Sequence, residues 1–408
     1  MKPVSESAQY HPLSLNYLNN TSLTHRKKRG QYFTPKNIRK ELLDLLPSLD
    51  QPKILDPGCG SGEFLAEAKL HYPDGELNGW DIEDKLLRIA ESVCPGAHYS
   101  KRDALSDNSD KEYDLIIGNP PYYEFKPEDN IKEIYADVIS GRPNIFALFI
   151  KKGLMLLKDG GYLAFVVPPS MNNGAFFKNL RQYILKQSSI VKLKILDSQE
   201  LFNSARQTVM LLVLQKKTGG TNYIFEKNGL MIFTPDRERL NKKFKGMTTF
   251  YEQGFKIRTG NIVWNENKDR LTNDPKDAVP LIWSHNIKNG LIDLSYNDNK
   301  PQYIRTDSFA TGPALVVNRV TGSVANSGLR TAVISCGTKF TAENHVNVIF
   351  PPAEFEATMC ALTGIAEYLM TSKIAEVIKL VTGNTQLSKT ELERLLPLPK
   401  KLFRNIKR

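Results

Sequence analysis

Ile54-Leu55-Asp56-Pro57-Gly58-Cys59-Gly60-Ser61-Gly62-Glu63-Phe64-Leu65 begins as an apolar segment, passes through three glycines at alternate positions, and continues as an amphipathic stretch to Leu70. This order predicts a buried strand, a tight turn and a helix. The glycines permit positive φ and let a ligand lie against bare backbone at the helix N-terminus. The spacing G-x-G-x-G differs from the dinucleotide fingerprint G-x-G-x-x-G. No Lys-Ser or Lys-Thr follows, so a phosphate-binding P-loop is disfavoured.

Acidic residues follow the next two predicted strands. Leu77–Ile82 contains Asp81, about 20 residues beyond the turn, where a carboxylate can bind both hydroxyls of a ribose. Asp103 comes after a third predicted strand and is suited to bind an adenine amino group. A single aspartate could equally be a helix cap or a solvated turn residue. Three acids at successive strand ends, with Asp56 the first, favour a shared ligand site.

A proline-rich turn follows the next predicted strand. Tyr113–Gly118 is an apolar run, and Asn119-Pro120-Pro121-Tyr122 comes directly after it. Two prolines cannot continue a central strand, so they predict a stiff turn at its carboxyl end, where open α/β sheets place their ligands. The amide oxygen of Asn119 and the carbonyl of Pro120 can accept the two protons of an exocyclic NH2 group. Tyr122 can stack on the plane that carries this group.

Three motifs in this order, Gln31-Tyr32-Phe33-Thr34-Pro35, Asp56–Gly62 and Asn119–Tyr122, resemble those of the gamma-type adenine-N6 DNA methyltransferases. Such enzymes use S-adenosylmethionine and often belong to bacterial restriction–modification systems. The likeness is clear over residues 26–216. It is weaker in the C-terminal region, in Asn318–Gly322, Glu343–His345 and Leu387–Lys389. The combination of motifs is specific, although no single motif is.

The resemblance implies S-adenosylmethionine as the cofactor and no metal ion. It assigns the cofactor contacts by position. These are Thr34 at the methionine end, Asp56 at the amino group, Asp81 at the ribose, Ile82 against the adenine ring, Asp103 at the adenine amino group, and the bare backbone of Gly58 and Gly60.

The resemblance also implies direct methyl transfer to a base that has been flipped out of duplex DNA. Hydrogen bonds from the adenine N6 to Asn119 and the Pro120 carbonyl would turn the nitrogen lone pair toward the sulfonium methyl group, so positioning and electrostatics suffice. Tyr122 would stack on one face of the base. Phe177 would lie on the other face, but its neighbour Phe176 is an equal candidate.

The sequence leaves the target base partly open. Cytosine-C5 chemistry would need a cysteine nucleophile, typically in a Pro-Cys pair, and the chain contains none. Cytosine-N4 chemistry could use the same turn. The asparagine that opens the turn favours adenine through the family resemblance.

Composition agrees with a nucleic-acid partner. The 408 residues suffice for two domains, and the net charge of +11 with a pI near 9.2 suits a polyanion. Four scattered cysteines without a C-x-x-C pair favour a reducing compartment. No apolar run approaches the length of a membrane span. Composition therefore predicts a cytoplasmic protein with a nucleic-acid partner. The family resemblance implies that this partner is double-stranded DNA and that a separate cognate restriction endonuclease accompanies the protein. One chain that carries catalytic and reader regions suggests a monomer.

Strands and helices alternate from Lys53 to Lys216, which predicts an α/β fold. We expect a mobile polar segment at 1–25 and a catalytic domain at 26–218. Its doubly wound, Rossmann-like methyltransferase sheet would have an antiparallel last strand. A C-terminal target-recognition domain of mixed α+β structure would occupy 221–408. In that domain the candidate DNA contacts are Arg319, His345 and Lys389.

Two other functions remain open. An Asn-Pro-Pro-Tyr methyltransferase could instead modify a protein glutamine, whose side chain also presents an NH2 group, or rRNA. The C-terminal region of nearly 190 residues disfavours the glutamine substrate. A non-enzymatic nucleic-acid-binding relic of the fold is disfavoured by the complete acceptor turn and the acidic set.

Overall fold

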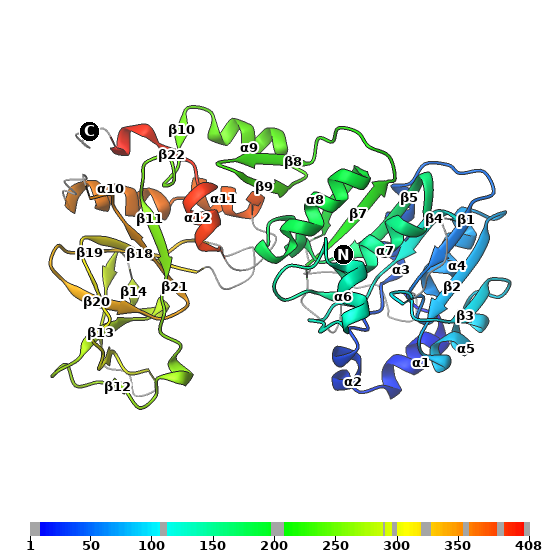
Figure 1. Ribbon diagram of the computed structural model, residues 1–408, viewed down its shortest axis with the longest axis horizontal. Helices are drawn as coiled ribbons and strands as arrows, with labels where there is room; N and C mark the ends of the chain where they lie inside the picture. Colours follow the sequence, from blue (N-terminus) through cyan, green and yellow to red (C-terminus); the bar gives the residue numbers. More distant parts are fainter. Residues whose placement is uncertain are drawn as a thin grey trace. The chain divides into compact units, whose positions relative to one another are not determined.

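The computed structural model describes residues 9–106, 112–196, 208–288, 290–295, 300–319, 328–353, 359–381 and 387–403. The chain divides into two compact units, unit 1 (Met1–Ile224) and unit 2 (Phe225–Arg408). Unit 1 is coloured blue to green and unit 2 green to red in Figure 1. Within the described ranges, no helix is both long enough and apolar enough to cross a membrane.

Unit 1 is built on a seven-stranded sheet with the order β3-β2-β1-β4-β5-β7-β6. Strand β7 runs antiparallel to both of its neighbours, and the other neighbouring strands are parallel. The strands are β1 (Lys53–Asp56), β2 (Glu76–Asp81), β3 (His98–Lys101), β4 (Tyr113–Gly118), β5 (Leu157–Val167), β6 (Ser189–Leu196) and β7 (Val209–Gln215). The predicted doubly wound, Rossmann-like methyltransferase sheet with an antiparallel last strand is confirmed.

The helices of unit 1 surround this sheet (Figure 1). They include α3 (Lys36–Asp44), α4 (Glu63–His71), α5 (Asp84–Val93), α6 (Asp129–Tyr135), α7 (Ile145–Leu156) and α8 (Lys178–Gln187). Every residue of α7 except Met155 is buried, and six of the seven residues of β7 are buried. Continuous apolar runs of this kind are expected where a sheet is covered on both faces.

The sheet order determines where the polar strand ends meet. Strands β1, β2 and β4 are parallel, and β1 lies between the other two. Their last residues are Asp56, Asp81 and Gly118. The carboxyl ends of neighbouring parallel strands lie at one edge of a sheet, so the glycine turn, both acids and the acceptor turn lie close together.

The N-terminal segment differs from the expectation of a mobile tail at 1–25. Helix α1 (Pro12–Asn20) buries Ser14 and Tyr17, and helix α2 (Leu23–Lys28) follows it. The Ser14 hydroxyl donates to Ser61 Oγ at 2.9 Å, and the Tyr17 hydroxyl donates to Glu83 Oε1 at 2.9 Å. These partners are far away in the sequence, so local periodicity gave no signal for them. Residues 1–8 lie outside the described part of the chain.

Three local boundaries near the site follow from the structure. Pro35 is the N-cap of α3, so Thr34 precedes the helix. Strand β5 begins at Leu157, directly after α7, and includes Gly160 and Gly161. Phe176 and Phe177 lie in a 3-10 turn, η3 (Ala175–Phe177), that precedes α8.

Unit 2 is rich in short strands and then helical, as the sequence predicts. One sheet has the order β11-β21-β18-β19 and another has the order β12-β16-β13-β20-β17. The first consists of β11 (Lys256–Thr259), β21 (Val346–Phe350), β18 (Ala314–Asn318) and β19 (Thr331–Ile334). The second consists of β12 (Leu271–Thr272), β16 (Tyr303–Ile304), β13 (Val279–Ile282), β20 (Lys339–Ala342) and β17 (Ala310–Thr311).

The remaining elements of unit 2 include β8 (Ile224–Lys227), β9 (Leu230–Phe233), α9 (Arg237–Phe244), β10 (Met247–Thr248), η5 (Ser284–Asn286), β14 (Ile287–Lys288), β15 (Leu291–Ile292), α10 (Met359–Leu369), α11 (Ser372–Val381), α12 (Lys389–Arg394) and β22 (Leu398–Pro399). Residues of α10, α11 and α12 join one apolar core with strands β11, β18 and β21. Unit 2 therefore has a hydrophobic core of its own.

Candidate active site

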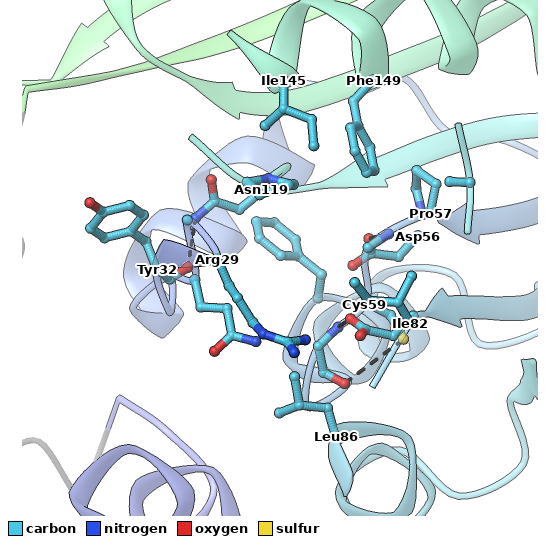
Figure 2. A pocket seen from close by; sticks show the side chains of 18 of the residues that line it. Arg29, Tyr32, Asp56, Pro57, Cys59, Ile82, Leu86, Asn119, Ile145 and Phe149 are labelled. Atoms are coloured by element: carbon cyan, nitrogen blue, oxygen red, sulfur yellow. Dashed lines mark hydrogen bonds between the residues drawn. The ribbon is translucent and has the colours of Figure 1, made fainter. Parts of the chain in front are cut away.

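A cavity of about 450 Å³ lies at the carboxyl edge of the sheet in unit 1. Its walls come from the glycine turn, the ends of β2 and β4, the segment around Asp103, and residues 28–34. Figure 2 shows Asn119 and Tyr32 on one side of the cavity and Asp56 and Ile82 on the other. The chain thus brings the three sequence motifs to one cavity.

Asp56 is the last residue of β1, directly before the glycine turn, and is 2% exposed. Its Oδ1 accepts a hydrogen bond from Gly58 N at 3.1 Å. Burial raises the pKa of this carboxyl group to about 8, and the charge of Asp81 acts in the same direction. No lysine or arginine of the described chain forms an ion pair with Asp56. A buried carboxylate without a counter-charge fits a cationic ligand group such as an ammonium.

Asp81 orders the two loops that border the cofactor side of the cavity. Its Oδ2 accepts from Gly60 N and its Oδ1 accepts from Glu83 N, both at 2.9 Å. Burial raises the pKa of this carboxyl group. A Cβ added to Gly60 would meet nothing within 4 Å, so its bare backbone borders open space. Ile82 follows Asp81 in the cavity wall and is 59% exposed, which leaves its side chain free to pack on a planar ring.

Asp103 also lines the cavity, but its oxygens have local partners. Oδ1 accepts from Leu105 N at 3.0 Å, and Oδ2 accepts from Ser106 Oγ at 2.8 Å. These bonds match the alternative of a turn-capping aspartate. A carboxylate has about four lone-pair sites, so they leave room for an adenine amino group as well.

The side-chain amide of Asn119 is oriented by the segment that precedes α3. Its Nδ2 donates to Tyr32 O at 2.8 Å and to Thr34 Oγ1 at 2.9 Å. Thr34 is 5% exposed, and its carbonyl accepts from the Arg39 guanidinium. Both amide protons are therefore used, and the Oδ1 atom is the part of the amide that can accept protons from a ligand.

Stacking of a target base on Tyr122 would require a free face of its ring, and the structure shows no such free face. Tyr122 is 8% exposed, and its hydroxyl lies within hydrogen-bond distance of Asn119 Oδ1 and Val166 O, which share its single proton. The ring stacks on Tyr32 with a centroid separation of 5.7 Å and meets Phe146 edge-on at 6.1 Å. Phe177 lies one ring further away, 5.1 Å from Phe146. Pro120 is buried within the turn.

The two phenylalanines that the sequence could not separate lie in different environments. Phe177 joins the aromatic cluster that contains Tyr122 and Phe146. Phe176 is 51% exposed, and its ring packs so closely on Gly141 that a Cβ there would come within 2.5 Å of it. Phe177 is therefore the better placed of the two to approach the acceptor turn.

The acceptor turn and the glycine turn touch at Gly118. This residue has φ +143°, and a Cβ built on it would lie 2.6 Å from Asp56 Oδ1. Glycine is required here for both its backbone conformation and its lack of a side chain.

Sequence reasoning missed a buried ion pair beside the site. Arg39 on α3 meets Glu63, the first residue of α4, at 2.7 Å, and the two side chains are 4% and 11% exposed. Glu63 Oε1 also accepts from His11 N at 2.8 Å. This pair joins helices α3 and α4 and the N-terminal segment. In the sequence, this ion pair is indicated only by Arg39, a charged residue at a position of α3 that faces the core.

A second missed cluster centres on Glu83. Its carboxylate accepts from Tyr17 and from Gln31 Nε2, the latter at 3.0 Å, and forms an ion pair with Arg29 at 3.5 Å. Arg29 and Gln31 line the cavity. The cluster ties residues 17–31 to the loop after Asp81.

The candidate DNA contacts in unit 2 fall into two places. Arg319 Nη1 donates to Asn344 O at 3.1 Å, and Arg319 N donates to His345 O at 2.9 Å, so Arg319 and His345 are adjacent. The His345 imidazole Nδ1 lies 2.7 Å from Glu343 Oε1. Lys389 is exposed and begins α12, where Ser388 and Glu391 form a capping box. The rest of the first motif, Val320–Gly322, lies outside the described residues.

This sheet order, with a glycine turn and successive acids around one cavity, is the arrangement expected of an S-adenosylmethionine-dependent methyltransferase. Residues 65–202 match the family described as the Eco57I restriction-modification methylase. The resemblance to restriction–modification DNA methyltransferases that the motifs indicated is thereby confirmed.

Curated relatives extend the likeness to most of the chain, including unit 2. The type II methyltransferase M.CvrRI of Paramecium bursaria Chlorella virus XZ-6E is 25% identical over 94% of this chain and 97% of its own length. The modification methylase CviBIII of Paramecium bursaria Chlorella virus NC1A is 25% identical over 96% of this chain and 99% of its own. The type II methyltransferase M.BsuBI of Bacillus subtilis is 22% identical over 97% of this chain and 92% of its own length.

Proposed function

We propose that this protein is a sequence-specific type II DNA methyltransferase that transfers the methyl group of S-adenosylmethionine to N6 of a flipped-out adenine. The observation that carries the proposal is the orientation of the Asn119 amide. Both Nδ2 protons are taken by Tyr32 O and Thr34 Oγ1, so Oδ1 remains as the acceptor for a substrate NH2 group. A reversed amide would present donors and would repel that group.

The chemistry needs no side chain that takes up a proton in the first step. Asn119 Oδ1 and the Pro120 carbonyl would accept the two N6 protons and turn the nitrogen lone pair toward the sulfonium methyl group. The N–CH3 bond would form as the S–CH3 bond breaks, and the sulfur would leave as a neutral thioether. The positive charge would pass from sulfur to N6, which would then lose a proton to water. The protein supplies alignment, which alone can lower such a barrier by roughly 7–11 kcal/mol.

Bound S-adenosylmethionine would supply the activated methyl group, and the residues around the cavity fit it. Asp56 would pair with the methionine ammonium, Asp81 with the ribose hydroxyls, and Asp103 with the adenine amino group. Ile82 would pack on the adenine ring, and Thr34 would border the methionine end. The exposed side chain of Ile82 and the open space at Gly60 support this placement.

Charge distribution supports unit 2 as the DNA target-recognition domain. Phe225–Arg408 contains 26 Lys and Arg against 18 Asp and Glu, which is +8 of the chain's net +11. Part of this charge gathers around the turn η5. Lys300 Nζ lies 5.0 Å above the Trp283 ring, and Arg330 Nη2 donates to Ser284 Oγ at 3.0 Å.

The same cluster acts on His285 in the middle of η5. Partial burial lowers the pKa of this imidazole, and the charges of Lys300, Lys288 and Arg330 lower it further. Asp293, which pairs with Lys288 at 2.7 Å, acts in the opposite direction. We name Lys288, Lys300 and Arg330 the η5 cations and propose that they contact DNA phosphates. The candidates Arg319, His345 and Lys389 remain proposals for further contacts.

The decisive experiment follows a labelled methyl group from S-adenosylmethionine into mixed genomic DNA and identifies the modified nucleoside. N6-methyldeoxyadenosine would support the proposal, and sequencing the modified sites would give the recognition sequence. N4-methyldeoxycytidine would overturn the choice of base. Cofactor binding without transfer to any DNA would overturn the proposed substrate and direct the same assay to rRNA and to protein glutamine. Asn119→Ala serves as the matched inactive control.

A further inference from the structure

The stacking face of Tyr122 is covered by another tyrosine of the same chain. The rings of Tyr32 and Tyr122 are stacked, with centroids 5.7 Å apart and planes inclined by 24°. Tyr122 as a whole is 8% exposed. A base needs an open ring face to stack on it, so the arrangement seen here excludes the target base from Tyr122.

Tyr32 and Tyr122 differ in how firmly they are held. The Tyr122 hydroxyl lies within hydrogen-bond distance of two oxygens, Asn119 Oδ1 and Val166 O, which share its single proton, and its ring packs on the fully buried Phe146. Tyr32 is half-buried and lies in the cavity wall. Its contact with Asn119 is through its backbone carbonyl. The Tyr32 ring can therefore turn away while its backbone continues to orient the amide.

We propose that the Tyr32 ring is a placeholder for the target base, which displaces it from Tyr122 during binding. This inference rests on the proposed function. The Asn119 Oδ1 lies within hydrogen-bond distance of the Tyr122 hydroxyl and keeps a second lone pair for a substrate NH2 group. A base that enters replaces the stacking contact of Tyr32 and offers Oδ1 its own NH2 group. Tyr32 is thus a positioning and selectivity residue, because only a group that supplies both interactions compensates for its displacement.

The inference predicts a specific change when the ring is removed. Tyr32→Ala deletes the competing ring but keeps the carbonyl that orients Asn119. The stacking of Tyr32 on Tyr122 stabilises the arrangement that excludes the base. Loss of this aromatic pair should therefore increase occupancy of the base site about two- to tenfold. The KM for DNA should fall by a similar factor, while kcat at saturating S-adenosylmethionine changes much less.

The test uses the full-length protein and a duplex probe that carries its recognition sequence, with adenine at the target position and a fluorophore at one end. Tyr32→Ala should lower the dissociation constant of the probe, measured by fluorescence anisotropy, and Tyr32→Phe should restore the wild-type value. Leu70→Ala, which truncates an exposed side chain of the same unit, controls for nonspecific effects. A double variant with Tyr122→Ala should abolish the gain.

The outcomes separate this inference from the proposed function. Weaker probe binding and a higher KM in Tyr32→Ala would show that the ring is a wall of the base pocket, and would overturn the placeholder inference while wild-type methylation stands. An unchanged dissociation constant of the probe in a Tyr32→Ala variant that melts at the wild-type temperature would also overturn it. If the wild-type protein methylates no DNA, it is the proposed function that fails.

Discussion

Asn119 and Thr34 are 85 positions apart in the sequence, and the Nδ2 atom of Asn119 donates to Thr34 Oγ1 at 2.9 Å. The bond connects the acceptor turn after β4 to the segment before α3. It means that the motif expected at the cofactor also sets the direction of the amide expected at the target base.

Replacing Asn119 should therefore affect catalysis more than cofactor binding. Asn119→Ala removes the acceptor aligned with the substrate NH2 group, and the loss of such a preorganised contact lowers kcat on the order of 10²-fold. Thr34→Val removes one of the two bonds that orient the amide and should lower kcat about two- to tenfold. Both are measured at saturating S-adenosylmethionine, with the cofactor dissociation constant determined by calorimetry. Wild-type turnover in Asn119→Ala would exclude the proposed role.

Asp81 should control affinity for the cofactor. Asp81→Ala removes the carboxylate that would hold the ribose and leaves Gly60 N and Glu83 N without their present acceptor. We expect at least about a tenfold rise in the dissociation constant for S-adenosylmethionine, because hydrogen bonds to charged groups are worth roughly 1.5–3 kcal/mol. Asp84→Asn is the matched control, since Asp84 lies on α5 and pairs with Lys101 at the surface. An unchanged constant for Asp81→Ala would refute the ribose assignment.

Cofactor binding should depend on pH through Asp56. Burial raises its pKa to about 8, so the carboxyl group is mostly protonated at neutral pH and must lose a proton to pair with the methionine ammonium. Affinity should rise from pH 6 toward 8 and then fall, because a free α-amino group itself titrates at about 7.7–8.0. Calorimetry in buffers of different ionisation enthalpy should reveal proton release at pH 7, and Asp56→Asn should abolish it.

The raised pKa of Asp56 also makes the free energy of unfolding depend on pH, in a direction that can be predicted. Folding raises the Asp56 pKa from 3.8 to about 8, so the folded state binds more protons than the unfolded state between these values. The contribution of Asp56 to the free energy of unfolding therefore falls as pH rises through this window. Chemical denaturation of the cofactor-free protein should show the trend, and Asp56→Asn should flatten it. A contribution that rises with pH would contradict the buried, uncompensated carboxyl group.

The η5 cations should determine the salt dependence of DNA binding. Arg330→Gln and Lys300→Gln each remove one proposed phosphate contact, so each should reduce the slope of log K against log salt by about 0.9. Binding should weaken for specific and nonspecific duplexes alike, with cofactor affinity unchanged. Lys373→Gln, at an exposed position of α11, is the control within the same unit. Unaltered slopes in both variants would exclude this cluster from the interface.

Local sequence patterns predicted the sheet and the position of Asp56 and Asp81 at one cavity, and the reason is physical. Buried parallel strands are apolar runs, and the polar residue that ends each run must lie at the ligand edge, as Asp56 and Asp81 do. The patterns could not predict hydrogen bonds and ion pairs between residues that are far apart in the sequence. The ion pair of Arg39 with Glu63 and the bond from Ser14 to Ser61 depend on how helices pack, which no local period encodes.

The role of Tyr122 shows the same limit at a single residue. The motif indicates an aromatic ring at the acceptor turn, but it does not reveal that Tyr32 covers that ring or that the hydroxyl holds Asn119. Likewise, the overall charge suggested a nucleic-acid partner, whereas the grouping of Lys288, Lys300 and Arg330 around one turn is visible only after strands β14, β18 and β19 have assembled.

Gly118 constrains how such a protein can diversify. A side chain at this position would collide with the carboxylate of Asp56 and would also require a backbone conformation that other residues avoid. A saturation library at residue 118 should thus yield almost no active clones, whichever base or recognition sequence is selected for. Laboratory efforts to change the target should therefore alter Asn119 or unit 2. A substitution of Gly118 would prevent binding of the methyl donor as well as change the specificity.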